Sequence, residues 1–435
     1  MVAWGCVADD LTGATDLATN LVARGFRTVV LFGASGDGLS TTPIAAIDEV
    51  DAIVVALKSR TAPVAEAVSS ARAALRVLEA AGVERIYVKY CSTFDSTPQG
   101  NIGTTIDTVL AETGEALTVV VPSFPDTGRT VYQGHLFVGD QLLSDSPMRH
   151  HPLTPMRDSS VPRLLAPQTT ADVAVIPLQV VRSGHAAVRS ALDALRRPDG
   201  RVLVVIDALT VDDLSTIAAA TSHLRVVTGA SGLAQGFVGE HAEGDIRSIP
   251  VVDGRRVSLC GSVSQQSQKQ VTAAHGHAPA RKLDIERLRH SFEQAVAEVI
   301  DWALGAWASD VSATPLVYSA DRPADVDTAP RSSGSAPASD LLERAFAAIA
   351  RGLVSAGARQ LIVAGGETAG SVVEGLGVRS LLIGPSIAPG VAWSAGALPD
   401  GTAVNLALKS GNFGGDDFFT SAWDVLDEAR SKGQP

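Results

Sequence analysis

The sequence predicts an α/β protein of two domains, each with a largely parallel sheet, and an active site in the cleft between them. The chain has 435 residues, which is more than one ordinary core accommodates. Short β-rich runs alternate with amphipathic helical patterns, as in βαβ units. Hydrophobic residues make up 46% and charged residues 19% of the chain, a composition typical of packed α/β layers.

The first series of elements predicts a domain over residues 1–245. A helical period begins near residue 12, and further helices are expected at 64–81 and 101–113. The expected strands are residues 3–8, 28–32, 52–56, 86–89, 117–121, 173–176, 202–206 and 224–228. Residues 122–170 show no period, so we interpret them as a long functional loop, because structureless stretches of this length are uncommon inside compact domains.

The domain boundary is expected near residues 245–254, and a second α/β domain over 255–435. Its strands are expected at 256–260, 316–319, 360–364, 380–383 and 403–408, and its helices at 265–275 and 285–308. Residues 321–339 are rich in Pro, Ser, Ala and Asp, a composition that cannot fill a core. We interpret that stretch as an exposed loop.

Charge and cysteine content restrict the class of protein. A net charge of −12 argues against general nucleic-acid binding, because phosphate contacts need clustered Lys and Arg. Cys6, Cys91 and Cys260 lack disulfide or metal-ligand spacing, which indicates a reducing compartment. The N-terminal residues do not resemble a leader peptide, and no apolar run is long enough for a membrane span. We expect a soluble cytoplasmic protein with no membrane partner, and a homo-oligomer is an open alternative to a monomer.

The common nucleotide and hydrolase motifs do not occur. The sequence contains no G-x-x-x-x-G-K-[ST], no G-x-G-x-x-G after the first strand, no H-E-x-x-H, no C-x-x-C and no G-x-S-x-G. Candidate sites therefore come from polar residues at predicted strand ends, where α/β proteins bind ligands.

The stretch VADDLTGA places two carboxylates, Asp9 and Asp10, between the first strand and a helix. Neighbouring side chains at a strand end point in different directions, so one can face a cleft while the other caps the helix. A carboxylate at a cleft could bind sugar hydroxyls or accept a proton. A capping role alone is an equally simple interpretation.

Two further stretches of the first domain supply candidate contacts. KYCSTFDSTPQG follows a strand with Lys89, Ser92 and Asp95, which suit a carboxylate and hydroxyls, although a polar turn is the alternative. The segment 122–170 adds an arginine suited to a carboxylate or phosphate and a possible anion clamp, although surface positions are the alternative. These cationic candidates are Arg129, Arg149, His150 and His151.

In the second domain, three glycine-rich turns follow predicted strands: CGSVSQQSQ, VAGGETAG and LKSGNFGGDDFF. Glycine lets the backbone approach a ligand, and helix N-termini bind phosphate. One such turn is a weak signal, but three in one domain favour a nucleotide site. The candidate nucleotide contacts are Ser262, Ser264, Gly365, Gly366, Glu367, Thr368 and Gly411.

Together with VPSFPDTGRTVYQGHLFVGD, MRHHPLTPM and TGASGLAQG, these motifs resemble the four-carbon acid sugar kinase family, most closely its 3-oxo-tetronate kinase branch. The resemblance runs in order from about residue 3 to about residue 419. It implies an N-terminal substrate-binding domain, a C-terminal nucleotide-binding domain, and transfer of the γ-phosphate of ATP, with Mg²⁺, to the terminal hydroxyl of a four-carbon acid. The metal ligands stay undetermined, and the motif leaves open which serine of the CGSVS turn contacts the nucleotide.

A carboxylate would orient the attacking hydroxyl, and the candidates are Asp10, Asp9 and Asp417. D-Threonate or D-erythronate is an alternative acceptor within the same kinase class. An alternative of another class is a non-catalytic sensor of a sugar acid and a nucleotide, although no helix-turn-helix segment supports it. A dehydrogenase is disfavoured because the dinucleotide fingerprint does not occur.

Overall fold

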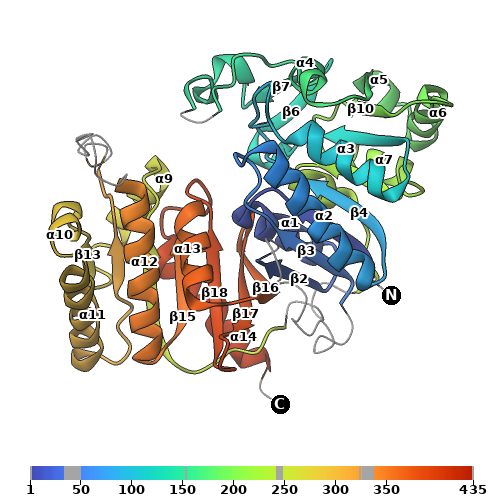
Figure 1. Cartoon of the computed structure of the whole chain (residues 1–435). Helices are drawn as coiled ribbons and strands as arrows, with labels where there is room; N and C mark the ends of the chain where they lie inside the picture. Colours follow the sequence, from blue (N-terminus) through green and yellow to red (C-terminus); the bar gives the residue numbers. More distant parts are fainter. Residues whose placement is uncertain are drawn as a thin grey trace. The chain divides into compact units, whose positions relative to one another are not determined.

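The computed structural model describes residues 2–33, 50–151, 154–241, 248–322, 325 and 338–433. Contacts divide the chain into two compact units, Met1–Ile246 and Arg247–Pro435. Each unit has a mostly parallel sheet with helices on its faces, so the predicted α/β class is confirmed (Figure 1). None of the helices that the structure describes combines the length and apolar character needed to cross a membrane.

The large sheet of the first unit is entirely parallel, in the order β2-β3-β1-β4-β11-β5-β10-β9. Its strands are rich in Val and Ile, as expected where helices cover both faces of a sheet. The strands are β1 (Val2–Ala8), β2 (Thr28–Phe32), β3 (Ala52–Ala56), β4 (Val83–Lys89), β5 (Leu117–Val121), β9 (Asp172–Ile176), β10 (Val202–Ile206) and β11 (Val226–Gly229).

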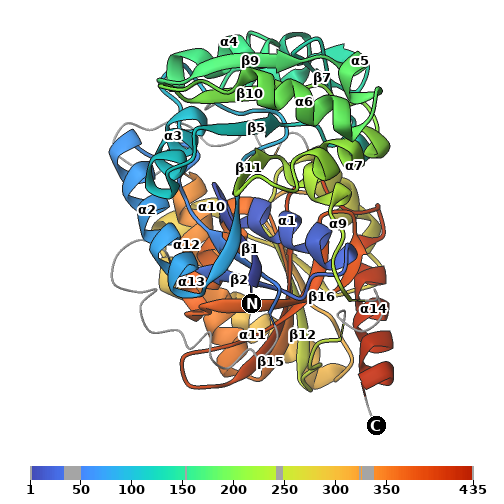
Figure 2. The same ribbon diagram turned by 90° about the vertical axis from the view of Figure 1, so that its right-hand side faces the viewer.

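Figure 2 shows α2 and α3 on one side of β4 and α1 on the other. Leu75 and Leu78 of α2 and Ile106 of α3 share one hydrophobic cluster with Val88 and Val120 of the sheet. The short helix η7 packs against both α1 and α7. The helices of this unit are α1 (Leu11–Ala23), α2 (Val64–Ala80), α3 (Ile102–Thr113), α5 (Leu178–Val181), α6 (His185–Leu195), α7 (Val211–Ala220) and η7 (Ser231–Gly236).

Strand register brings three chain segments to one edge of this sheet. Ala8, the last residue of β1, lies beside Ala56 of β3 and Lys89 of β4. The loops that follow β1, β3 and β4 therefore leave the sheet side by side, at the carboxyl edge where α/β sheets bind ligands.

Residues 122–170 are not structureless, so the prediction of one long loop is wrong. They contain a small antiparallel sheet and short helices. The elements are β6 (Arg129–Tyr132), β7 (His135–Val138), β8 (Gln141–Leu142), η3 (Pro125–Thr127), η4 (Leu143–Asp145), η5 (Pro147–His150), α4 (Val161–Leu165) and η6 (Ala166–Gln168). Strands of two to four residues are too short to produce a detectable hydrophobic period.

The second unit has a mixed sheet in the order β13-β14-β12-β15-β18-β17-β16. The first five strands are parallel, and β17 runs antiparallel to β16 and β18. The strands are β12 (Arg255–Cys260), β13 (Ala280–Lys282), β14 (Leu316–Tyr318), β15 (Ala358–Ala364), β16 (Ser380–Ala388), β17 (Val391–Ala397) and β18 (Ala403–Lys409). The sequence did not reveal β17, VAWSAGA, in which small residues obscure the alternation.

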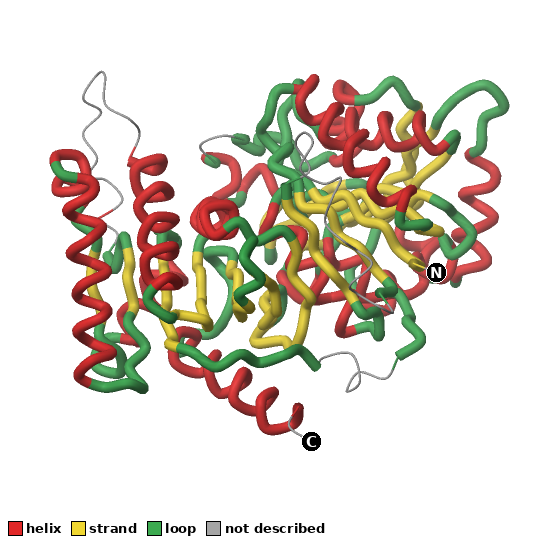
Figure 3. The backbone as a smooth tube through the Cα atoms, turned by 60° about the horizontal axis from the view of Figure 1, so that its bottom comes forward, coloured by secondary structure: helices red, strands yellow, loops and turns green. Residues whose placement is uncertain are grey.

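Helices cover both faces of this second sheet (Figure 3). Val271 of α9 and Leu426 of α14 share a hydrophobic cluster with Cys260 and Ile362, while α12 packs against both α11 and α13. The predicted helix 285–308 is two helices that break at Ser291. The helices are α9 (Gln265–Ala274), α10 (Ile285–His290), α11 (Phe292–Ser309), α12 (Ala338–Ser355), α13 (Gly366–Leu376) and α14 (Phe418–Gly433). Most of the predicted loop 321–339 lies outside the described residues.

Candidate functional site

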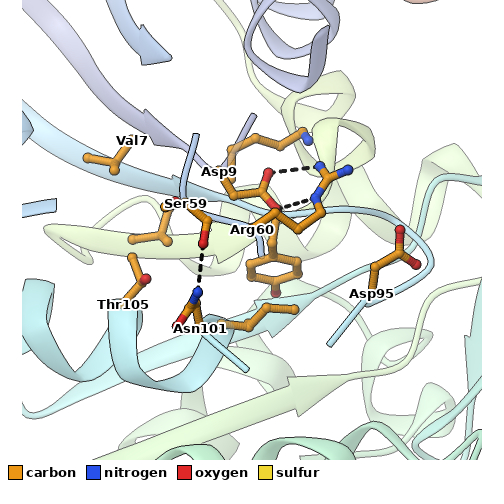
Figure 4. Close-up of a pocket in the computed structure, with 11 residues that line it drawn as sticks. Val7, Asp9, Ser59, Arg60, Asp95, Asn101 and Thr105 are labelled. Carbon is orange, nitrogen blue, oxygen red and sulfur yellow. Dashed lines mark hydrogen bonds and ion pairs between the residues drawn. The ribbon is translucent and has the colours of Figure 1, made fainter. Parts of the chain in front are cut away.

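A pocket opens at the carboxyl edge of the first unit's sheet (Figure 4). It is lined by side chains from the ends of β1 and β4, the loop after β3, and the start of α3. The polar lining residues are Asp9, Ser59, Arg60, Lys89, Asp95, Asn101 and Thr105. Carboxylates, cations and neutral polar groups thus face one small space.

Arg60 joins both carboxylates of the VADD stretch. Its Nε and Nη2 donate to the two oxygens of Asp9, at 2.8 and 3.0 Å, in a forked pair. The same Nη2 donates to Asp10 Oδ1 at 2.7 Å. Asp10 is also the N-cap of α1, accepting from the amide of Gly13 at 3.0 Å. Asp10 therefore caps the helix, and Asp9 lines the pocket.

Neighbouring opposite charges favour the ionised forms of Asp10 and Arg60. Burial would raise the pKa of Asp10, but the charges of Arg60 and Lys89, with hydrogen bonds from Thr12 and Gly13, outweigh it and hold the pKa below its ordinary value. Burial would likewise lower the pKa of Arg60, but Asp10 and Asp9 raise it well above its ordinary value. Asp10 and Arg60 therefore stay charged at neutral pH.

Gly13, in the first turn of α1, lies close to two charged side chains. A Cβ at this position would lie 2.1 Å from Asp10 Oδ1 and 2.6 Å from the ammonium of Lys89. Lys89 itself is 4% exposed. A side chain at position 13 would therefore displace the capping carboxylate or the buried lysine.

The structure brings some predicted contacts together and not others. Asp9, Lys89 and Asp95 line the pocket, whereas Ser92 lies in the turn between Lys89 and Asp95 without lining it. The predicted cations of residues 122–170 make local contacts instead: Arg129 donates to the carbonyl of Thr127, Arg149 donates to that of Ser144, and His151 Nδ1 contacts Thr154. His150 is exposed at the end of η5.

Sequence reasoning missed Arg60, Ser59, Asn101 and Thr105. The sequence did contain a signal for Ser59 and Arg60, because LKSRT directly follows the predicted strand 52–56. Polar residues after that strand meet those after β1 whenever the two strands are neighbours.

The three glycine-rich turns of the second unit lie at one edge of its sheet. Cys260, the last residue of β12, pairs with Ala364 of β15, and Ala364 pairs with Lys409 of β18. A Cβ on Gly411 would lie 2.5 Å from Ser262 Oγ and 3.0 Å from Ser264 Oγ. The turns after these three strands therefore touch one another.

The carbonyl of Gly411 is held by three donors. It accepts hydrogen bonds from Ser264 Oγ at 2.7 Å, Ser267 Oγ at 2.9 Å and the ammonium of Lys409 at 3.0 Å. Ser264 is also the N-cap of α9. These contacts fix the Gly411 turn against the start of α9.

The start of α13 has no side-chain cap. Its N-cap is Gly365, with φ +117°, a region that favours glycine. Thr368, a predicted nucleotide contact, is buried in the first turn and does not cap it. Gly366 and Glu367 are exposed at this end of the helix. The first amides of α13 therefore form a start suited to a bound anion.

Asp417 lies in the same unit, just before α14. It is exposed, and its carbonyl accepts from the amides of Thr420 and Ser421. The neighbouring Asp416 accepts from Gln266 of α9 at 3.0 Å. The turn that carries these carboxylates is thus attached to α9.

Comparison with known proteins divides the chain near the same place as the boundary between its two compact units. Residues 4–237 match the family described as "Sugar-binding N-terminal domain", and residues 257–419 match "Nucleotide-binding C-terminal domain". A 3-oxo-tetronate kinase of Burkholderia multivorans is 44% identical over 98% of this chain and 97% of its own length. Another, from Salmonella typhimurium, is 40% identical over 97% and 99%.

Solved structures resemble the whole chain as well. A Salmonella typhimurium protein described as a putative tRNA synthase has a TM-score of 0.85 and 38% identity, over 97% of this chain and 99% of its own. A Haemophilus influenzae protein has a TM-score of 0.78 and 37% identity, over 97% and 100%. The chain belongs to the four-carbon acid sugar kinase family, as its motifs predicted.

Proposed function

We propose that this chain is an ATP-dependent kinase that phosphorylates the C4 hydroxyl of a four-carbon sugar acid, with 3-oxo-tetronate as the acceptor. The observation that carries the proposal is the set of curated relatives called 3-oxo-tetronate kinase, which are 39–44% identical over nearly their full lengths. The two polar edges described above supply a place for each substrate.

The pocket of the first unit suits the acid. Lys89 and the guanidinium of Arg60 provide positive charge for its carboxylate. Asp9, Asp95 and Asn101 provide acceptors for its hydroxyls. This mixture fits a small ligand that carries both an anionic end and hydroxyl groups.

The turns of the second unit suit ATP. The first amides of α13, with Gly365 at its N-cap, would face phosphate, as would Ser262 beside Gly411. Within the described ranges, no group of three or more His, Cys, Asp or Glu side chains is placed to hold a metal ion. Mg²⁺ usually binds through substrate phosphates and only one or two carboxylates, so we propose that it enters with ATP.

Among the three candidate carboxylates, Asp9 is best placed to orient the attacking hydroxyl. Asp9 lines the pocket, and each of its oxygens accepts one hydrogen bond from Arg60, which leaves acceptor capacity on both. Asp10 Oδ1 already accepts from Gly13 and Arg60, and Asp10 Oδ2 accepts from Thr12. We therefore assign substrate orientation to Asp9 and support of that carboxylate to Asp10.

The test is ADP release with ATP and Mg²⁺ on a panel of four-carbon acids. We expect the highest kcat/KM with 3-oxo-tetronate and lower values with D-threonate and D-erythronate. Asp9→Asn should lower kcat on the order of 10²-fold or more, and Asp10→Asn should act less on kcat. Absence of ADP release with every acid would overturn the proposal and favour a non-catalytic sensor.

Lys409 gives a prediction for the nucleotide side. Its side chain is fully buried, and its ammonium donates to the carbonyls of Ser410 and Gly411. Lys409→Met removes the charged donor and should raise the KM for ATP roughly tenfold, because charge-assisted bonds are about twice as strong as neutral ones and the turn loses its position. The KM for the acid should change little.

The charge of Lys409 also predicts a pH dependence. Burial lowers its pKa to about 8, although Cys260 opposes the shift. The KM for ATP should therefore rise by a few fold above pH 8 in the wild type, and this step should vanish in Lys409→Met. Because the folded pKa is below the unfolded value of about 10.4, this group makes the free energy of unfolding rise with pH between those values. Equal pH profiles of KM in both proteins would contradict the prediction.

A further inference from the structure

Two buried oxygen atoms on the wall of the first unit's pocket lack a hydrogen-bond donor. They are Asp95 Oδ1 and Asn101 Oδ1, and neither has a partner within the described part of the chain. Their side chains are only 8% and 6% exposed. Buried acceptors are nearly always paired, so two on one pocket wall indicate donors supplied by a ligand.

The orientation of Asn101 is fixed by its own donors. Its Nδ2 donates to the carbonyls of Ser59 at 2.7 Å and Ala62 at 2.8 Å, both on the loop after β3. Exchange of the amide nitrogen and oxygen would place an oxygen against these two carbonyls. The free group of Asn101 is therefore an acceptor, and it can accept only from a donor such as a hydroxyl.

The start of α3 cannot satisfy these acceptors. The side-chain oxygen of Gln168 accepts from the amides of Ile102 and Gly103, at 3.1 and 3.3 Å, and from Ser96 Oγ at 3.0 Å. Gln168 thus occupies the first donors of α3. An anionic group of the ligand would find the amides of Ile102 and Gly103 already occupied and would meet two oxygen acceptors.

Asp95 is held in place by the residues before it. Phe94 has φ +53°, uncommon for a residue with a side chain, and its ring is fully buried against Tyr90, with centroids 5.4 Å apart. Tyr90 OH lies 3.2 Å from Thr228 Oγ1 of β11. A packed aromatic pair therefore anchors the turn, so Asp95 presents its carboxylate from a fixed backbone.

We propose that Asp95 and Asn101 form a hydroxyl-reading pair: one of the two accepts the hydrogen bond of the C2 hydroxyl of the four-carbon acid, whose C4 hydroxyl donates to Asp9 and whose carboxylate lies toward Lys89 and Arg60. This inference rests on the proposed kinase function and deepens it. A 3-oxo acid of this length carries hydroxyls at C2 and C4. The pair therefore selects acids that carry a hydroxyl in addition to the one that is phosphorylated.

The experiment compares 3-oxo-tetronate with its 2-deoxy analogue, which keeps the C4 hydroxyl and can still be phosphorylated. In the wild type, loss of the C2 hydroxyl leaves a buried acceptor unpaired, so kcat/KM should fall on the order of 10- to 100-fold. This ratio should shrink to within about threefold in Asp95→Ala or in Asn101→Ala, whichever residue reads the C2 hydroxyl, because alanine leaves no acceptor at that position. Asp140→Asn, an exposed carboxylate in the turn between β7 and β8, should keep the wild-type ratio.

Thermal unfolding distinguishes a variant that has lost substrate recognition from one that no longer folds. Asp95→Ala should keep the wild-type midpoint, because Oδ1 has no hydrogen bond within the described residues to lose. If a variant does not fold, the two acids on the wild type still test the proposal. Equal use of both acids, or an unchanged ratio in both folded variants, would overturn it. If no ADP is released with any of the acids, the kinase function is overturned instead.

Discussion

Replacing Arg60 with methionine is expected to lower kcat/KM for the acid on the order of 100-fold or more. Arg60 holds Asp9 in a forked pair and also binds Asp10, so its loss releases both carboxylates from their positions. The side chains of this cluster are 15–27% exposed, so solvent reduces the stability cost to about 2 kcal/mol. Steady-state kinetics and urea unfolding measure the two effects.

The same variant predicts a pH dependence of stability. The lowered pKa of Asp10 contributes stability above its unfolded pKa of about 3.9, and this contribution is lost as the pH falls through the folded value. Among the interactions that lower the pKa of Asp10, the charge of Arg60 is the largest. The difference in free energy of unfolding between the wild type and Arg60→Met should therefore become smaller below about pH 4. Unfolding free energies at pH 7 and near pH 3.5 provide the measurement.

Arg72→Met is the matched control, since Arg72 and Glu112 form an exposed ion pair of 2.8 Å in the same unit. Its loss should cost less than about 0.5 kcal/mol and leave kinetics unchanged. Similar effects from both arginine variants would show that Arg60 acts only as a surface charge.

Gly365→Ala is expected to raise the KM for ATP about tenfold or more. A Cβ at this position would lie 3.0 Å from both the amide of Ser262 and Thr368 Oγ1, so the two glycine-rich turns must separate. The backbone φ of +117° adds strain of roughly 1–2 kcal/mol. The KM for the acid should change little, because the acid pocket is in the other unit.

Gly401→Ala is a control that introduces backbone strain without a steric contact. Gly401 has φ +84° in the turn between β17 and β18, and a Cβ there would meet no atom within 4 Å. It should lose comparable stability in thermal unfolding while keeping the wild-type KM for ATP. A wild-type KM in Gly365→Ala would remove this turn from the nucleotide site.

The two carboxylates of VADD show how far local sequence can be interpreted. A buried strand followed by a helical period predicted that Asp9 and Asp10 stand at a strand end, which is correct. Local pattern could not divide their roles, because the division depends on Arg60, about fifty residues away in the chain. Only the pairing of β1 with β3 brings that arginine to them.

The cations of residues 122–170 illustrate a different limit. Their enrichment in an acidic chain suggested an anion clamp, which stays a prediction; in the structure Arg129 and Arg149 each donate to a nearby backbone carbonyl. Composition shows which charged residues a segment contains, but it does not show which hydrogen-bond acceptors lie beside them in the folded chain. Asn101 escaped notice for a related reason: its role depends on two carbonyls of a loop about forty residues earlier.

The sequence by itself determined the fold class, most strand positions in both units, and the three glycine-rich turns that follow β12, β15 and β18. Those properties depend on local periodicity and on backbone freedom, which neighbouring residues specify. The tertiary structure alone decided that Arg60 joins Asp9 to Asp10 and that Asp95 and Asn101 keep acceptors free in the pocket. Such pairings depend on strand register and loop contacts between distant segments, and local pattern does not contain them.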